Sequence, residues 1–155
     1  MTSSENDTNH PAKTPRGLFI EDLETGMSAE YTRTVTQADI AQFAELSGDN
    51  NPVHLDEAYA AQTLFKGRIS HGVLTASYIS TVIGTKLPGP GAIYLSQQLK
   101  FLAPVRPGDT VLTRATITEI NPEKRRITLE TVCTVSEKPV LKGEAVIMVP
   151  SRSGE

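Results

Sequence analysis

The 155-residue sequence has little of several features that define large protein classes. Its single cysteine, Cys133, excludes an intramolecular disulfide and a cysteine-built zinc site, and it fits a reducing compartment. With 15 Lys and Arg against 18 Asp and Glu, the chain lacks the excess positive charge that nucleic-acid binding needs. No apolar run approaches the roughly 20 residues of a membrane span, and the N-terminus has no apolar core of the signal-peptide type. We therefore expect a small cytoplasmic protein with no nucleic-acid partner and no membrane span.

Apolar residues are spread unevenly along the chain. Residues 1–16 contain almost none and include two prolines, so this segment cannot bury enough surface to offset its chain entropy. The last residues, 151–155, have the same character. Neither a repeat nor a linker divides the middle. We expect a disordered N-terminal arm over residues 1–16, one folded domain over 17–150 and a flexible tail over 151–155.

Periodicity and capping residues predict one strand and two helices in the first part of the domain. Residues 28–35 alternate between polar and apolar, as a strand does. Thr36 is placed to begin a helix, with Asp39 in position for a capping box and Gly48 for the helix end. A short second helix is predicted over residues 56–64.

A longer helix is predicted over residues 72–86. Apolar and small residues surround it and no charge precedes its last residue, so we expect it to be buried on all sides. The fold class is therefore α+β, with a curved antiparallel sheet wrapped around a long buried central helix. Because such a sheet leaves long open edges, we expect at least a dimer. The remaining strands are predicted as a meander over residues 92–102, 110–120, 125–135 and 140–149.

A carboxylate and an imidazole, those of Asp49 and His54, lie five residues apart on either side of Pro52. Proline fixes its own φ and holds the preceding Asn51 in an extended conformation, so the separation of the two side chains is well defined. At about one water's width apart, the pair could grip a water while one group accepts a proton and the other donates one. Any one of these residues alone is more typical of a turn or a packed loop. Their combination around a rigid proline favours a functional site.

A second candidate is the segment Ser70, His71 and Gly72 at the start of the uncharged helix. A helix N-terminus has unpaired N–H groups and a positive dipole end, and Gly72 would let a thioester carbonyl approach its backbone N–H. Plain capping, with Ser70 as the N-cap, explains the same residues. Ser80, eight residues further on, could hydrogen-bond the loop that carries Asp49, or its own helix.

Asp49, His54, Asp56 and His71 could also be considered as metal ligands. No HExxH or comparable ligand spacing supports such a site. The sequence also lacks a nucleophile elbow and a phosphate-binding glycine loop. We expect no bound metal and no cofactor.

The stretch FAELSGDNNPVHLDEAYA, residues 43–60, closely resembles the hydratase 2 motif of the MaoC-like dehydratases. These are (R)-specific enoyl-CoA hydratases with a hot-dog fold. The motif combines an aromatic residue, Ser-Gly-Asp, Asn-Pro, an aliphatic residue, His and a small residue, and each of these is present. The similarity covers nearly all of residues 26–150 and continues through Ser70–Gly72, Ile93–Leu95, Phe101–Val105 and Pro107–Asp109.

The resemblance implies a role for each matching residue. Asp49 and His54 would be the catalytic pair that activates water, and Asn51 would orient their loop. Gly72 would donate its N–H to the thioester carbonyl, and Ser80 would support the site from the helix. The implied reaction is the reversible hydration of trans-2-enoyl thioesters to (R)-3-hydroxyacyl thioesters by a homodimer. The implied substrate is an acyl-CoA or an acyl-carrier-protein thioester.

Two alternative functions stay open. A thioesterase of the same fold would usually carry a catalytic Glu or Asp on the central helix, and residues 72–86 contain neither. A non-catalytic acyl-thioester-binding subunit would commonly have lost the Asp and His pair, which is present here. Both observations favour the hydratase.

Overall fold

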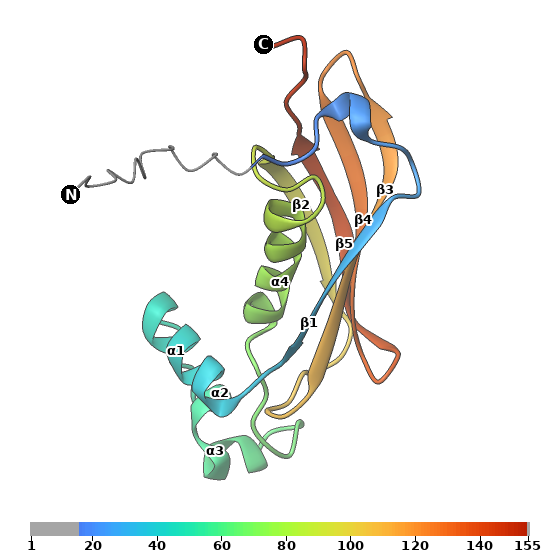
Figure 1. Cartoon of the computed structure of the whole chain (residues 1–155). Coiled ribbons are helices and arrows are strands. Elements are labelled where there is room, and N and C mark those ends of the chain that lie inside the picture. Colours follow the sequence, from blue (N-terminus) through green and yellow to red (C-terminus); the bar gives the residue numbers. More distant parts are fainter. Residues whose placement is uncertain (1–15, 155) are drawn as a thin grey trace, which may run out of the picture.

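The computed structural model describes residues 16–154, so the expected N-terminal arm lies outside the described residues except for its last residue. An antiparallel five-stranded sheet curves around one long helix, and three short helices gather at one end of that helix (Figure 1). The strands are β1 (Ser28–Thr34), β2 (Ile93–Phe101), β3 (Thr110–Asn121), β4 (Arg126–Val135) and β5 (Lys138–Met148). The helices are a 3₁₀ turn η1 (Ile20–Asp22), α1 (Gln37–Ser47), α2 (Pro52–Leu55), α3 (Glu57–Ala61) and α4 (Gly72–Thr85). The expected α+β architecture is confirmed.

The hydrophobic core lies between the inner face of the sheet and one face of α4. Buried and more exposed residues alternate along β3 and β4, because successive side chains of a strand point to opposite faces. The inner face carries branched aliphatic residues that pack well on a pleated surface. Fully buried core residues from both layers are Ile117, Leu129, Ile147, Ile79, Val82 and Ile83.

The order of the strands differs from the predicted meander. β3, β4 and β5 follow one another, but β2 pairs with β5 at one edge of the sheet, giving the order β1-β3-β4-β5-β2. Hairpin loops have about 2–5 residues, and the connection between β2 and β3, residues 102–109, is longer than that. It therefore takes the chain across the sheet to the position beside β1. β1 and β2 are left as the two edge strands.

The expectation that α4 is buried on all sides is wrong for the single chain. The sheet covers one face of the helix, and the opposite face is exposed along a stripe of small or apolar residues. Val73 in this stripe keeps 62% of its surface exposed. The absence of charge indicated full burial, but the sheet of one chain covers only one side of a helix. The stripe consists of Val73, Ser77, Ser80 and Gly84.

The first helix follows its prediction closely. Thr36 caps α1 and forms a capping box with Asp39, and Gly48 ends it in the left-handed conformation with φ of 79°. The predicted helix over residues 56–64 is shorter, because only α3 is helical there and Asp56 is its N-cap. The short helix α2 was not predicted. It begins at Pro52, whose fixed φ suits the first position of a helix.

The two ends of the described chain lie close together. Ser151 and Arg152 hydrogen-bond to Glu21 and Asp22 of η1. No helix among residues 16–154 is both long enough and apolar enough to cross a membrane.

Candidate functional site

The loop after α1, the short helix α2 and the start of α4 bring three titratable side chains together. Asp49, His54 and His71 each offer an oxygen or nitrogen atom, and these atoms all lie within 4.8 Å of one another. The two imidazoles are buried, whereas Asp49 is exposed. The structure therefore places the predicted pair, Asp49 and His54, side by side, and it adds His71 to them.

The loop that carries Asp49 is held by its own short side chains. The Ser47 hydroxyl accepts the N–H of Asp49 at 3.2 Å, and the Asp49 carboxylate accepts the N–H of Asn51 at 3.3 Å. The Asn51 side chain in turn accepts the N–H of Val53 at 3.2 Å and so caps α2. Asn51, with φ −52° and ψ 124°, thus joins the Asp49 loop to α2, and the orienting role that the resemblance implies stays a prediction. These bonds limit the positions that the carboxylate can take.

His54 is oriented by the segment that precedes α4. Its Nδ1 lies 2.8 Å from the carbonyl oxygen of Ile69, which can only accept, so Nδ1 carries the proton and Nε2 is left as a proton acceptor. Burial lowers the pKa of His54, and the neighbouring His71 lowers it further. The hydrogen bond to Ile69 and the charge of Asp49 partly oppose this effect. His54 is therefore a neutral imidazole at neutral pH.

His71 links the two parts of the site. It is only 2% exposed, and its ring lies 3.8 Å from that of His54 and 4.7 Å from that of Phe43, measured between centroids. Its Nε2 donates to the backbone carbonyl of Asp49 at 2.9 Å. The sequence pattern indicates no role for His71 in holding the Asp49 loop, and a bond between residues so far apart leaves no local signal that could have revealed it.

His71, and not Ser70, is the N-cap of α4, and its side chain makes no capping hydrogen bond. Gly72 is then the first helical residue, so its N–H has no acceptor within the helix. A Cβ at this position would lie 2.6 Å from Cε1 of Phe101, which is closer than real Cβ atoms come to a neighbour. Phe101 packs directly on Gly72, which explains the glycine, and Gly72 itself stays exposed.

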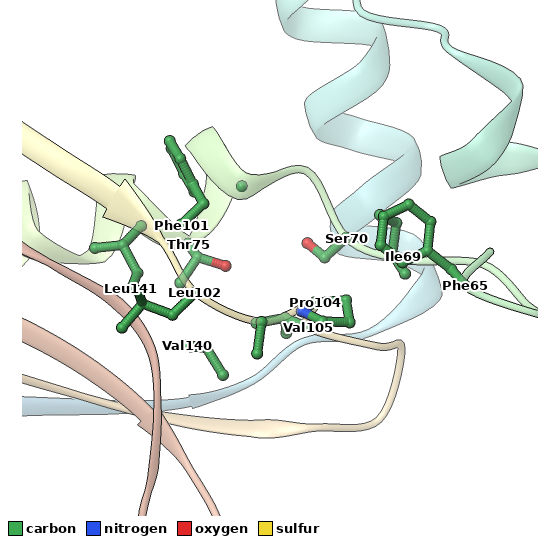
Figure 2. Close-up of a pocket in the computed structure, with 12 residues that line it drawn as sticks. Phe65, Ile69, Ser70, Thr75, Phe101, Leu102, Pro104, Val105, Val140 and Leu141 are labelled. Atoms are coloured by element: carbon green, nitrogen blue, oxygen red, sulfur yellow. The ribbon is translucent and has the colours of Figure 1, made fainter. Parts of the chain in front are cut away.

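A pocket of about 340 Å³ opens beside Gly72 (Figure 2). All the residues that line it are uncharged. The polar side chains among them are Ser70 and Thr75. The sequence indicates Ser70 only as part of the segment that begins α4, and it does not single out Thr75. The apolar wall includes Phe65, Ile69, Phe101, Leu102, Val140 and Leu141.

Ser80 lies away from this cluster. It is exposed on the uncovered face of α4. At 1.5 Å per residue it is about 12 Å along the helix axis from Gly72. Within one chain it is therefore not placed to contact the Asp49 loop, and its supporting role stays a prediction.

The cluster of Asp49, His54 and His71 also has the composition of a metal site. Each imidazole already uses one nitrogen on a backbone carbonyl, however, and the remaining nitrogen of His71, Nδ1, is buried without a partner among residues 16–154. Asp56, the fourth residue considered, accepts the N–H of Tyr59 and caps α3. The expectation of no metal stays a prediction.

The arrangement has the parts that an addition to a polarised double bond requires. A carboxylate and a neutral imidazole could hold a water and exchange protons with it. An unpaired N–H at a helix N-terminus could stabilise negative charge on a carbonyl oxygen. The apolar pocket could hold a hydrocarbon chain.

Comparisons with known proteins agree with this geometry. The family described as "MaoC like domain" matches residues 19–139. The (R)-specific enoyl-CoA hydratase of Rhodospirillum rubrum is 54% identical over 134 residues, which cover 86% of this chain and 93% of that protein. The 3-hydroxybutyryl-CoA dehydratase of Methylorubrum extorquens is 48% identical over 137 residues, 88% of this chain and 87% of that protein. Unliganded R-hydratase PhaJ1 from Pseudomonas aeruginosa superposes with a TM-score of 0.83 at 46% identity, covering 88% of each chain.

The family match spans most of the domain, including the Asp49 loop, all of α4 and the sheet up to the start of β5. The relatives share about half of their residues with this chain over nearly its whole folded length. The chain belongs to the family of MaoC-like domains, with the hot-dog fold.

Proposed function

We propose that the protein catalyses the reversible, (R)-specific hydration of trans-2-enoyl-CoA thioesters to (R)-3-hydroxyacyl-CoA thioesters. The observation that carries this proposal is the placement of Asp49 and neutral His54 together, next to the N-terminus of α4. The names of the two relatives support the reaction, and the name of the first supports its (R) outcome.

The reaction follows from what each group can do. The thioester carbonyl accepts the N–H of Gly72, which draws electron density from C3 of the conjugated chain. Water held by Asp49 and His54 adds its oxygen to C3, and one of the two groups takes the released proton. The charge on the carbonyl oxygen then returns to C2, which takes up the proton that the water released, so one water is added across the double bond and the acid–base group is restored. Dehydration is the reverse path, and neither direction uses a redox cofactor.

One assay tests this proposal against its rivals. Crotonyl-CoA is supplied, and the loss of conjugated absorbance and the release of free thiol are followed together. A hydratase removes the absorbance and releases no thiol, and chiral analysis of the product then gives the (R) isomer. Release of thiol would indicate the thioesterase. If neither the loss of absorbance nor the release of thiol occurs, the protein is a non-catalytic binding subunit.

We also propose that the protein acts as a homodimer. The exposed stripe of α4 lacks charge, and the edge strand β2 has exposed apolar residues at Ile93, Tyr94 and Leu95. Open strand edges are commonly paired with a second copy. Sedimentation equilibrium would give twice the chain mass if this is correct.

The substrate carrier and the location complete the proposal. Coenzyme A is favoured over acyl carrier protein by the names of the two relatives. A cytoplasmic location fits the lone buried thiol of Cys133, because reducing compartments keep thiols free. Assays of crotonyl-CoA beside the matching acyl-carrier-protein thioester would test the carrier.

A further inference from the structure

Thr75 has a buried hydroxyl that nothing in the described chain satisfies. The residue is 2% exposed, and its Oγ1 has no hydrogen-bond partner among residues 16–154. A threonine inside a helix usually returns its hydroxyl to the carbonyl four residues earlier. Here the carbonyl of His71 accepts the N–H groups of Leu74 and Thr75 but not the hydroxyl of Thr75. A buried unpaired hydroxyl is costly, so its retention calls for an explanation.

The free hydroxyl points into the pocket beside Gly72. Figure 2 shows the oxygens of Thr75 and Ser70 directed toward one another within the pocket. The Ser70 hydroxyl has only a long contact, 3.5 Å to the carbonyl of His71. The pocket therefore combines an apolar wall with hydroxyl groups at the end nearest the start of α4.

Helix geometry brings Thr75 close to the N–H of Gly72. Side chains of a helix lean toward its N-terminus, so a residue covers the turn that precedes it. Thr75 is three residues after Gly72 and thus on the same face, and both line the same pocket. A ligand oxygen that accepts the Gly72 N–H is therefore within the region that the Thr75 hydroxyl faces.

We propose that the Thr75 hydroxyl donates a second hydrogen bond to the thioester carbonyl oxygen, beside the N–H of Gly72. This inference rests on the proposed function and names a further catalytic residue for it. Two donors stabilise the charge that forms on this oxygen when water adds to C3 better than one does. The bond also gives the hydroxyl the partner that it lacks in the free protein.

Replacement of Thr75 by Val tests the proposal, because Val keeps the shape of Thr and removes only the hydroxyl. We expect kcat/KM for crotonyl-CoA to fall by about 10²-fold, mostly through kcat, as for other donors to such an oxygen. Thr75→Ser, which keeps the hydroxyl, should retain most of the activity. The melting temperature of Thr75→Val should equal or exceed that of the unchanged protein, since an unsatisfied buried group is removed.

Thr85→Val is the matched control. Thr85 lies on the same helix, is exposed, and already donates its hydroxyl to the carbonyl of Thr81 at 2.6 Å. Its replacement should leave kcat/KM unchanged. Should Thr75→Val fail to fold, Thr75→Ala replaces it in the comparison with Thr75→Ser.

A second measurement does not depend on turnover. Butyryl-CoA labelled with ¹³C at the carbonyl binds but has no double bond to hydrate, and its carbonyl stretch can be followed by infrared difference spectroscopy. We expect a lower frequency when it is bound to the unchanged protein than to Thr75→Val. Equal frequencies, or near-normal kcat/KM in Thr75→Val, would overturn the assignment. Absence of hydratase activity in the unchanged protein would instead refute the proposed function.

Discussion

The two ends of α4 differ in how their polar groups are satisfied. At the C-terminal end Thr81 and Thr85 are not buried and return their hydroxyls to the helix, at 3.5 and 2.6 Å from their acceptors. At the N-terminal end Thr75 is buried and unpaired, and the ring nitrogen Nδ1 of His71 is buried and unpaired too. The hydroxyls of Thr81 and Thr85 are thus satisfied within the helix, whereas that of Thr75 is unpaired beside the pocket, and the buried hydroxyl of Tyr78, midway along the helix, is unpaired as well. The unpaired groups of Thr75 and His71 thus lie at the end of the helix that faces the pocket.

The largest expected effect of a substitution is at the loop beside this N-terminal end. Asp49→Asn and His54→Gln each keep the size of the side chain and remove its capacity to take a proton. We expect each to lower kcat for crotonyl-CoA by roughly 10²–10⁴-fold, the usual contribution of a positioned acid or base. Circular dichroism should show both variants folded, because Asp49 is exposed and Gln can fill the site of His54. Folded variants with near-normal rates would end the assignment of this pair.

The features of this loop could be predicted because they are local in sequence. Thr36, Asp39 and Gly48 specify α1 through contacts over a few residues, and the five-residue spacing of Asp49 and His54 keeps the loop after α1 and the short helix α2 close together. Such short-range geometry is determined by dihedral preferences and capping bonds.

The features that the sequence did not reveal depend on distant partners. The bond of His71 to the Asp49 carbonyl joins residues 22 apart, and the position of β2 beside β5 depends on where the chain crosses the sheet. The exposed stripe of α4 was predicted to be buried, because a helix face without charge has the same composition whether its own chain covers it or leaves it open. Likewise, the unpaired state of the Thr75 hydroxyl depends on the packing around it, which the sequence alone does not show.

Substitutions in the C-terminal half of α4 should change the stability of the protein and leave its turnover rate unchanged. Ile79 is fully buried against the sheet, so Ile79→Ala should lower the free energy of unfolding by about 2–5 kcal/mol through lost burial and a cavity. Urea denaturation measures this loss. The rate per folded molecule should stay close to normal, because Ile79 does not line the pocket. A loss of rate without a loss of stability would contradict the division between the two ends.

His71 contributes both to the site and to the stability of the fold. Its replacement should lower stability less than Ile79→Ala does. His71→Phe preserves a ring against His54 and Phe43 but removes the donor to the Asp49 carbonyl. We expect the free energy of unfolding to fall by about 1 kcal/mol, the net value of one hydrogen bond.

His71→Gln is the control, since its amide can still donate to the Asp49 carbonyl while the ring is lost. If the hydrogen bond holds the loop, Gln should preserve kcat better than Phe does. The opposite order would show that ring stacking on His54 is what positions the site.

The smallest predicted effect is on the pH dependence of stability. The pKa of His54 lies below its ordinary value of 6.5, first because of burial and then because His71 is beside it, while the Ile69 carbonyl and Asp49 partly raise it. The unfolded chain therefore binds a proton at this residue at a higher pH than the folded chain does. Folding stability should be fully present above pH 6.5 and should decline as the pH falls below that value.

Urea denaturation at pH 7.5, 6.5 and 5.5 can isolate this contribution when His54→Gln is measured beside the unchanged protein. Glutamine does not titrate, so the variant should lose less stability between pH 6.5 and 5.5. The same lowered pKa keeps Nε2 unprotonated, so the acid limb of kcat/KM should lie below pH 6.5 in the unchanged protein. If His54→Gln and the unchanged protein lost stability in parallel, other groups would carry the acid sensitivity. His54 would then not be held neutral by its burial at this end of the helix.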